Sequence, residues 1–194
     1  MGLTREAITA VMGEPAIADP IRAFVGLDTA TEVEDRVDIL MDELIRTGAF
    51  DRSVLCFASP TGSGYINYVL AEALEYMTLG DCAIATMQYS MLPSSMSLTR
   101  TALAVEQNRD LMHAITGYLR GMQPERRPKF VLFGESLGAL TMQDIWRRRT
   151  VDAMDRDFVH SSIFLGTPSA TEFAKSWRLN PDKVDPEGKV VEVD

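Results

Sequence analysis

The sequence has 194 residues, of which 46% are hydrophobic and 24% charged, so it can bury one sizeable core and we expect one globular unit. Its 28 acidic residues against 19 basic ones give a net charge of -9, which argues against nucleic acid as the main partner. No stretch approaches the roughly 20 apolar residues of a membrane-spanning helix, and the N-terminus lacks the apolar core of a signal peptide. The chain as written is therefore expected to be soluble and cytoplasmic.

The first part of the chain contains an arm, a strand and a helix. Residues 1–21 combine a short amphipathic pattern with two prolines, which predicts a loosely attached arm without chemistry. Residues 22–27 could form an edge strand. Thr31 and Glu34 predict a capping box for the helix that follows, and Gly48 predicts its end.

A glycine-rich loop follows the next apolar strand, residues 53–58, and precedes a helical pattern. The loop, residues 59–64, would present backbone N–H groups to an oxyanion or to a phosphate. It lacks the Gly-Lys-Ser/Thr of a P-loop, and Asn67 replaces the third glycine of a dinucleotide fingerprint. The nucleotide alternative stays open. The oxyanion interpretation fits better, and it predicts Thr61, with Gly62 next, as a donor.

The third apolar strand, residues 82–87, leads into Tyr89 and Ser90. Loops at the carboxyl end of a parallel strand line the ligand crevice, so Gly62, Tyr89 and Ser90 are possible pocket residues. For Tyr89 a plain core or rim aromatic is the more frequent outcome.

The two cysteines, Cys56 and Cys82, each lie inside a predicted strand, and neither has metal-ligand spacing with a histidine. Buried reduced thiols are favoured over a disulfide. We predict no metal site and no cofactor.

A long helical pattern runs from residue 99 to residue 122. Asn108 falls on its apolar face, whereas His113 falls among charged residues on the polar face. His113 is therefore expected to be solvated.

The chain is organised around the apolar run that ends in Gly134-Glu135-Ser136-Leu137-Gly138. The spacing is that of a nucleophile elbow, in which a sharp strand-to-helix turn requires small residues on both sides of the serine. A buried-type strand, residues 129–133, precedes the motif and a helical pattern follows it. This predicts Ser136 as a nucleophile, with the Leu137 N–H as an oxyanion donor.

Beyond the elbow, the arginines at 147–149 suit a helix C-terminus, which favours capping over nucleic-acid binding. Residues 160–165 predict another strand, followed by Gly166-Thr167-Pro168. His160 begins this strand, so it is expected at the sheet edge opposite Ser136. Residues 189–193 alternate like a further strand.

Several segments together carry a resemblance to a known family. They are Phe24-Val25-Gly26-Leu27-Asp28, Glu43-Leu44, Arg46-Thr47-Gly48-Ala49-Phe50, Ser59-Pro60-Thr61-Gly62, Glu72-Ala73-Leu74-Glu75-Tyr76, Met87-Gln88-Tyr89-Ser90, the elbow and Gly166-Thr167-Pro168. From about residue 22 to residue 194 the chain resembles a largely uncharacterised bacterial alpha/beta-hydrolase family, whose members commonly carry an N-terminal membrane-spanning portion. The resemblance implies a three-layer α/β fold, with a mostly parallel sheet and helices on both faces, in one domain of residues 22–194. It also implies Ser136 as the nucleophile and a membrane-associated full-length protein.

Two departures from that family bear on activity. The membrane portion is absent, and in this fold the acid and the histidine follow the nucleophile in chain order. His160 is the only histidine that follows Ser136, and Asp194 is a weak candidate for the acid. We therefore expect a truncated C-terminal part and an inactive fragment.

The sequence thus predicts a serine hydrolase that acts on a small ester or other acyl substrate, with the acid and the histidine of its triad missing from this chain. The alternative is a noncatalytic, hydrolase-like binding or scaffold module.

Overall fold

The computed structural model describes residues 2–91, 101–147, 149–168 and 171–192. Its strands form one parallel sheet in the order β1-β3-β2-β4-β5. The strands are β1 (Ile21–Val25), β2 (Val54–Ser59), β3 (Cys82–Met87), β4 (Lys129–Glu135) and β5 (Val159–Leu165). All five lie where apolar runs predict them, and β1 is an edge strand as expected. The further strand expected at 189–193 is wrong for residues 189–192, which form no strand.

The helices are α1 (Arg5–Met12), α2 (Val33–Thr47), α3 (Tyr68–Met77), α5 (Thr101–Gly121), α6 (Leu137–Gln143), α7 (Asp152–Arg156), α8 (Glu172–Leu179) and α9 (Pro181–Val184). Short 3-10 helices span Ala49–Asp51, Pro124–Arg126 and Asp144–Trp146. None of the helices in the described part is long and apolar enough to cross a membrane.

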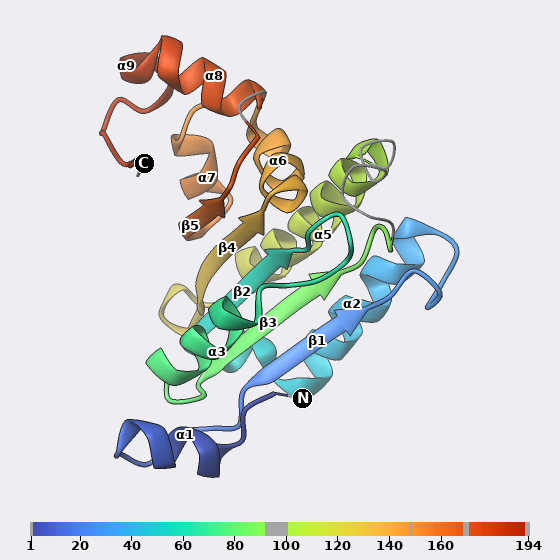
Figure 1. Cartoon of the computed structure of the whole chain (residues 1–194), viewed down its shortest axis with the longest axis vertical. Helices are drawn as coiled ribbons and strands as arrows, with labels where there is room; N and C mark the ends of the chain where they lie inside the picture. Colours follow the sequence, from blue (N-terminus) through green and yellow to red (C-terminus); the bar gives the residue numbers. More distant parts are fainter. Residues whose placement is uncertain (1, 92–100, 148, 169–170, 193–194) are drawn as a thin grey trace.

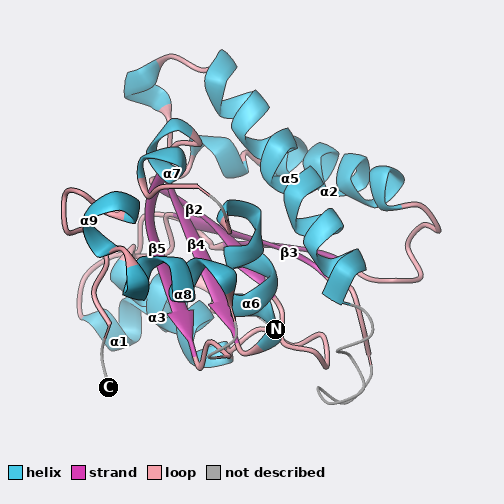
Figure 2. Cartoon of the chain, turned by 90° about the horizontal axis from the view of Figure 1, so that it is seen from above, coloured by secondary structure: helices cyan, strands magenta, loops and turns pink. Residues whose placement is uncertain are grey.

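Helices cover both faces of the sheet, with α2 and α5 on one face and α3 on the other (Figures 1 and 2). On the first face Leu40, Leu111 and Trp146 belong to the larger apolar cluster, together with inward side chains of every strand. On the second face α3 covers a smaller cluster around Cys56 and Phe133. The three-layer α/β fold is thereby confirmed.

The ends of α2 test two local predictions. Gly48 ends the helix with φ 73°, the left-handed conformation in which glycine is favoured, as expected. The predicted capping box is wrong, because Glu32 is the N-cap residue and makes no side-chain capping bond.

The N-terminal arm is packed rather than loosely attached. Ile8 is fully buried, and the buried carboxylate of Glu75 on α3 accepts from the Leu3 N–H at 3.2 Å. The other oxygen of Glu75 pairs with Arg22 Nε at 2.5 Å. A glutamate far along the chain thus fastens the arm to β1 and α3, which composition alone could not reveal.

Candidate active site

Ser136 stands at a strained turn between β4 and α6, with φ 55° and ψ −117°. A non-glycine residue in such a conformation costs on the order of 1–3 kcal/mol and persists only where its surroundings impose it. The N–H of Ser136 donates to the carbonyl oxygen of Leu165 at 2.9 Å, which ties the turn to the end of β5. The serine is half-buried, at the carboxyl edge of the sheet.

Both glycines of the elbow are required by close backbone contacts. A Cβ on Gly138 would lie 2.4 Å from the carbonyl oxygen of Ser59 and 2.6 Å from that of Pro60. A Cβ on Gly134 would lie 2.7 Å from the backbone of Ala139. Side chains at these two positions would push α6 away from β2 and β4. The turn therefore requires small residues on both sides of Ser136, as the Gly-x-Ser-x-Gly spacing predicts.

Leu137 is the first residue of α6, and its side chain is buried. The first N–H groups of a helix have no partner within the helix. The Leu137 N–H is one of these groups, and it directly follows Ser136.

The second expected donor, Thr61, does not have a free N–H in this structure. The Thr61 N–H donates to the carbonyl oxygen of Tyr65 at 2.9 Å, and the Gly64 N–H donates back to the Thr61 carbonyl at 2.9 Å. The loop after β2 therefore closes on itself. Thr61 could serve an oxyanion only if the turn opened, which corrects the simple expectation from its position after the strand.

The same loop is closed to a phosphate at the start of α3. Asn67 caps this helix, and its Oδ1 accepts from the N–H groups of Val69 at 3.0 Å and Leu70 at 3.4 Å. Its Nδ2 lies 3.3 Å from a carboxylate oxygen of Glu135. Helix donors that are already bonded, next to a carboxylate, count against the nucleotide alternative.

The possible pocket residues Gly62, Tyr89 and Ser90 are all buried. Tyr89 is fully buried, which agrees with the core alternative, and its hydroxyl makes no hydrogen bond within the described residues. Burial raises the pKa of Tyr89 to about 12.

A buried polar cluster lies directly beneath the elbow and consists of Ser59, Asn108 and Thr141. The Asn108 amide donates to Ser59 Oγ at 2.9 Å and to Thr141 Oγ1 at 3.1 Å. Sequence reasoning placed Asn108 on the buried face of its helix without a role. The available signal was an amide on the helix face that also carries Leu111 and Ile115.

Neither histidine of the chain lies where it could activate Ser136. His113 is exposed on α5. His160 is the second residue of β5, whereas Ser136 contacts Leu165, the last residue of that strand. Leu165 is five residue steps along the strand from His160, which corresponds to about 17 Å. The expected placement of His160 at the opposite sheet edge is confirmed.

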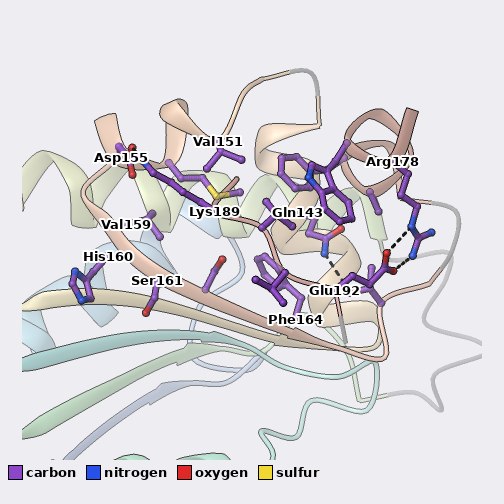
Figure 3. A pocket seen from close by; sticks show the side chains of 18 of the residues that line it. Gln143, Val151, Asp155, Val159, His160, Ser161, Phe164, Arg178, Lys189 and Glu192 are labelled. Carbon is purple, nitrogen blue, oxygen red and sulfur yellow. Dashed lines mark hydrogen bonds and ion pairs between the residues drawn. The ribbon is translucent and has the colours of Figure 1, made fainter. Parts of the chain in front are cut away.

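A cavity of about 600 Å³ runs along β5, with His160 towards one end and Glu192 towards the other (Figure 3). Phe164, Phe173 and Trp177 supply apolar walls. Gln143 also lines the cavity, and its Nε2 lies 3.2 Å from Thr167 Oγ1.

Both cysteines are free and buried, as predicted. Burial raises the pKa of Cys56 to about 12 and that of Cys82 to about 11. Since the thiolate is the reactive form, neither thiol suits nucleophilic chemistry near neutral pH.

A parallel sheet between two helix layers, with a serine presented on a strained strand-to-helix turn, defines a three-layer α/β protein with the backbone of a nucleophile elbow. The model of the alpha/beta-hydrolase family matches residues 21–190, and the chain belongs to this family. Membership supports a hydrolase as the class of the protein.

No curated protein matches the sequence. Among solved structures, an acetylxylan esterase determined at 0.90 Å resolution matches with a TM-score of 0.44 and 15% identity. The match covers 60% of this chain and 64% of that chain, so the chain spans less than two thirds of the esterase.

Proposed function

We propose that this protein is a serine hydrolase in which Ser136 attacks the carbonyl carbon of an ester or other acyl substrate. The observation that carries the proposal is the strained backbone of Ser136, held between two glycines whose replacement would clash with backbone atoms. Such strain persists where the surrounding structure imposes it and is often part of a site's mechanism.

In the proposed reaction Ser136 Oγ bonds to the carbonyl carbon while its proton passes to a base. The oxygen of the tetrahedral intermediate accepts from the Leu137 N–H. The base then returns the proton to the leaving alcohol, and water releases the acid from the acyl-enzyme by the reverse route. One oxyanion donor typically contributes on the order of 3 kcal/mol to the transition state.

The base is neither His113 nor His160, because one is exposed on α5 and the other starts at the far end of β5. A serine hydroxyl without a base is a weak nucleophile. We therefore propose that a group outside these 194 residues completes the site and that the chain alone reacts slowly. From the resemblance to that family, we also propose that the full-length protein is membrane-associated.

A fluorophosphonate probe tests the proposal on the 194-residue chain and on the full-length product of its gene. We expect labelling of Ser136 in the full-length product, slower labelling of the chain, and none in Ser136→Ala. Labelling that persists unchanged in Ser136→Ala, or no labelling of the full-length protein, would contradict the proposal.

The position of both histidines also favours a second candidate, a noncatalytic hydrolase-like binding or scaffold module. The two candidates differ in one outcome. A scaffold would show no probe reaction in any form of the protein.

A further inference from the structure

The buried polar cluster of Ser59, Asn108 and Thr141 connects the three elements that meet below the elbow. Ser59 is the last residue of β2, Asn108 lies on α5 and Thr141 lies on α6. All three are at most 1% exposed. They are buried polar side chains at the end of a core whose larger cluster on this face is apolar.

The hydrogen bonds of the cluster form a chain of donors and acceptors that leads from Asn108 to the backbone of the elbow. The Asn108 amide donates to both hydroxyl oxygens, at 2.9 Å and 3.1 Å. The hydroxyl of Thr141 in turn donates to the carbonyl oxygen of Gly138 at 3.2 Å. Gly138 is the second glycine of the elbow, two residues beyond Ser136.

The cluster also lies where the end of β2 is in close contact with α6. Ser59 is paired with Gly134 across the sheet, and its carbonyl oxygen faces the Cα of Gly138. Apolar contacts at this junction would allow the helix to slide by fractions of an ångström. Hydrogen bonds among buried groups fix such distances more sharply, because a broken one leaves a buried polar atom unpaired.

We infer that Ser59, Asn108 and Thr141 are positioning residues for Ser136, which act through Gly138 by holding the first turn of α6 against the end of β2. The inference rests on the proposed function, since it concerns the placement of the same serine and of the Leu137 N–H. A misplacement of about 1 Å in a reacting group can cost on the order of 100-fold in rate.

Thr141 allows a test that separates the hydroxyl from packing. Thr141→Val keeps the volume and removes the hydroxyl, whereas Thr141→Ser keeps the hydroxyl and removes a methyl group. Thr116→Val is the matched control. Thr116 is also a buried helix residue, and its hydroxyl donates to the carbonyl oxygen three residues earlier at 3.2 Å. It lies on α5 about two turns beyond Asn108, away from the cluster.

Fluorophosphonate labelling at Ser136 is measured as kinact and KI in the full-length protein. We expect kinact to fall about tenfold in Thr141→Val with KI within twofold of wild type, because an orientation defect acts on the reaction more than on binding. Thr141→Ser stays within threefold and Thr116→Val is unchanged. Wild-type kinact in Thr141→Val, or an equal loss in Thr141→Ser, would overturn the inference.

Amide hydrogen exchange of residues 137–140 provides a readout that needs no catalysis. We expect faster exchange in Thr141→Val than in Thr141→Ser or Thr116→Val. If the wild type is never labelled, the proposed function fails and exchange alone decides the inference, with equal exchange in all variants overturning it. Ser59→Ala replaces Thr141→Val in both measurements if the latter does not fold.

Discussion

The N–H of Ser136 donates to the carbonyl oxygen of Leu165 at 2.9 Å, so the tip of the elbow is fastened to the last residue of β5. The elbow is therefore supported from both neighbouring strands. On the other side, Gly138 rests against the carbonyl oxygens of Ser59 and Pro60 at the end of β2. These contacts impose the strained backbone of Ser136.

Replacement of Ser136 by glycine should abolish reaction with the probe and relieve backbone strain at the elbow. Ser136→Gly removes the side chain that makes φ 55° unfavourable, whereas Ser136→Ala keeps a Cβ in the same conformation. We expect Ser136→Gly to be more stable than Ser136→Ala by about 1–2 kcal/mol. Urea unfolding of the two variants measures the difference, and neither should react with the probe. Equal stabilities would mean that the turn is not strained.

Gly138→Ala should destabilise the fold at the elbow. The added Cβ would meet backbone oxygens at 2.4 Å and 2.6 Å, and backbone cannot rotate away as a side chain can. We expect a loss of about 1–3 kcal/mol in the free energy of unfolding, together with loss of labelling at Ser136.

Gly117→Ala on α5 is the matched control for that substitution. Apart from its chain neighbours and the backbone of its own helix, no atom lies within 4 Å of the added Cβ, so the variant should gain about 0.5–1 kcal/mol from helix propensity. A Gly138→Ala variant as stable as Gly117→Ala would show that α6 can move away from β2 without cost.

The buried thiols should be unreactive in the native protein and should make it sensitive to high pH. At pH 8 we expect no reaction of Cys56 or Cys82 with a thiol-specific disulfide reagent, and reaction of both after unfolding. Because burial raises the pKa of Cys56 from 9.0 to about 12, its stabilising contribution is complete below pH 9 and is lost as the pH rises towards 12. In that range the unfolded thiol releases its proton and the folded thiol does not.

Cys56→Ser isolates this effect, since a serine hydroxyl does not ionise there. Above pH 9 the free energy of unfolding of the wild type should fall more steeply than that of Cys56→Ser, by up to about 1.4 kcal/mol per pH unit. Chemical denaturation between pH 8 and pH 10.5 measures both slopes. Parallel slopes would contradict a buried, neutral thiol at position 56.

Much of the fold could be predicted because its signals are short-range. Each strand is a compact apolar run, and Gly48 ends α2 by a preference of its own backbone. The first residue of a helix is less well determined by local sequence. Thr31 and Glu34 have the right spacing for a cap, yet the chain enters the helix at Val33, and the boundary shifts by a residue or two without any change in the pattern.

The site was predictable only in part, for a similar reason. Thr61 has the right position after β2, but the hydrogen bond of its N–H to Tyr65 depends on how the loop turns. Likewise, the pattern placed Tyr89 after β3 and could not decide between the pocket and the core. Asp194 lies outside the described residues.

The sequence by itself determined the elbow: an apolar strand, two glycines around Ser136 and a following helix are local requirements of one turn, and steric rules between near neighbours are enough to read them. Only the tertiary structure decided what supports that turn. The Leu165 carbonyl, the Glu75 carboxylate that holds the arm, and the Ser59–Thr141 contact across 82 residues of chain depend on strand order and helix packing. Those are long-range relationships. The identity of a polar side chain does not indicate which distant residue the fold will bring within hydrogen-bonding distance of it.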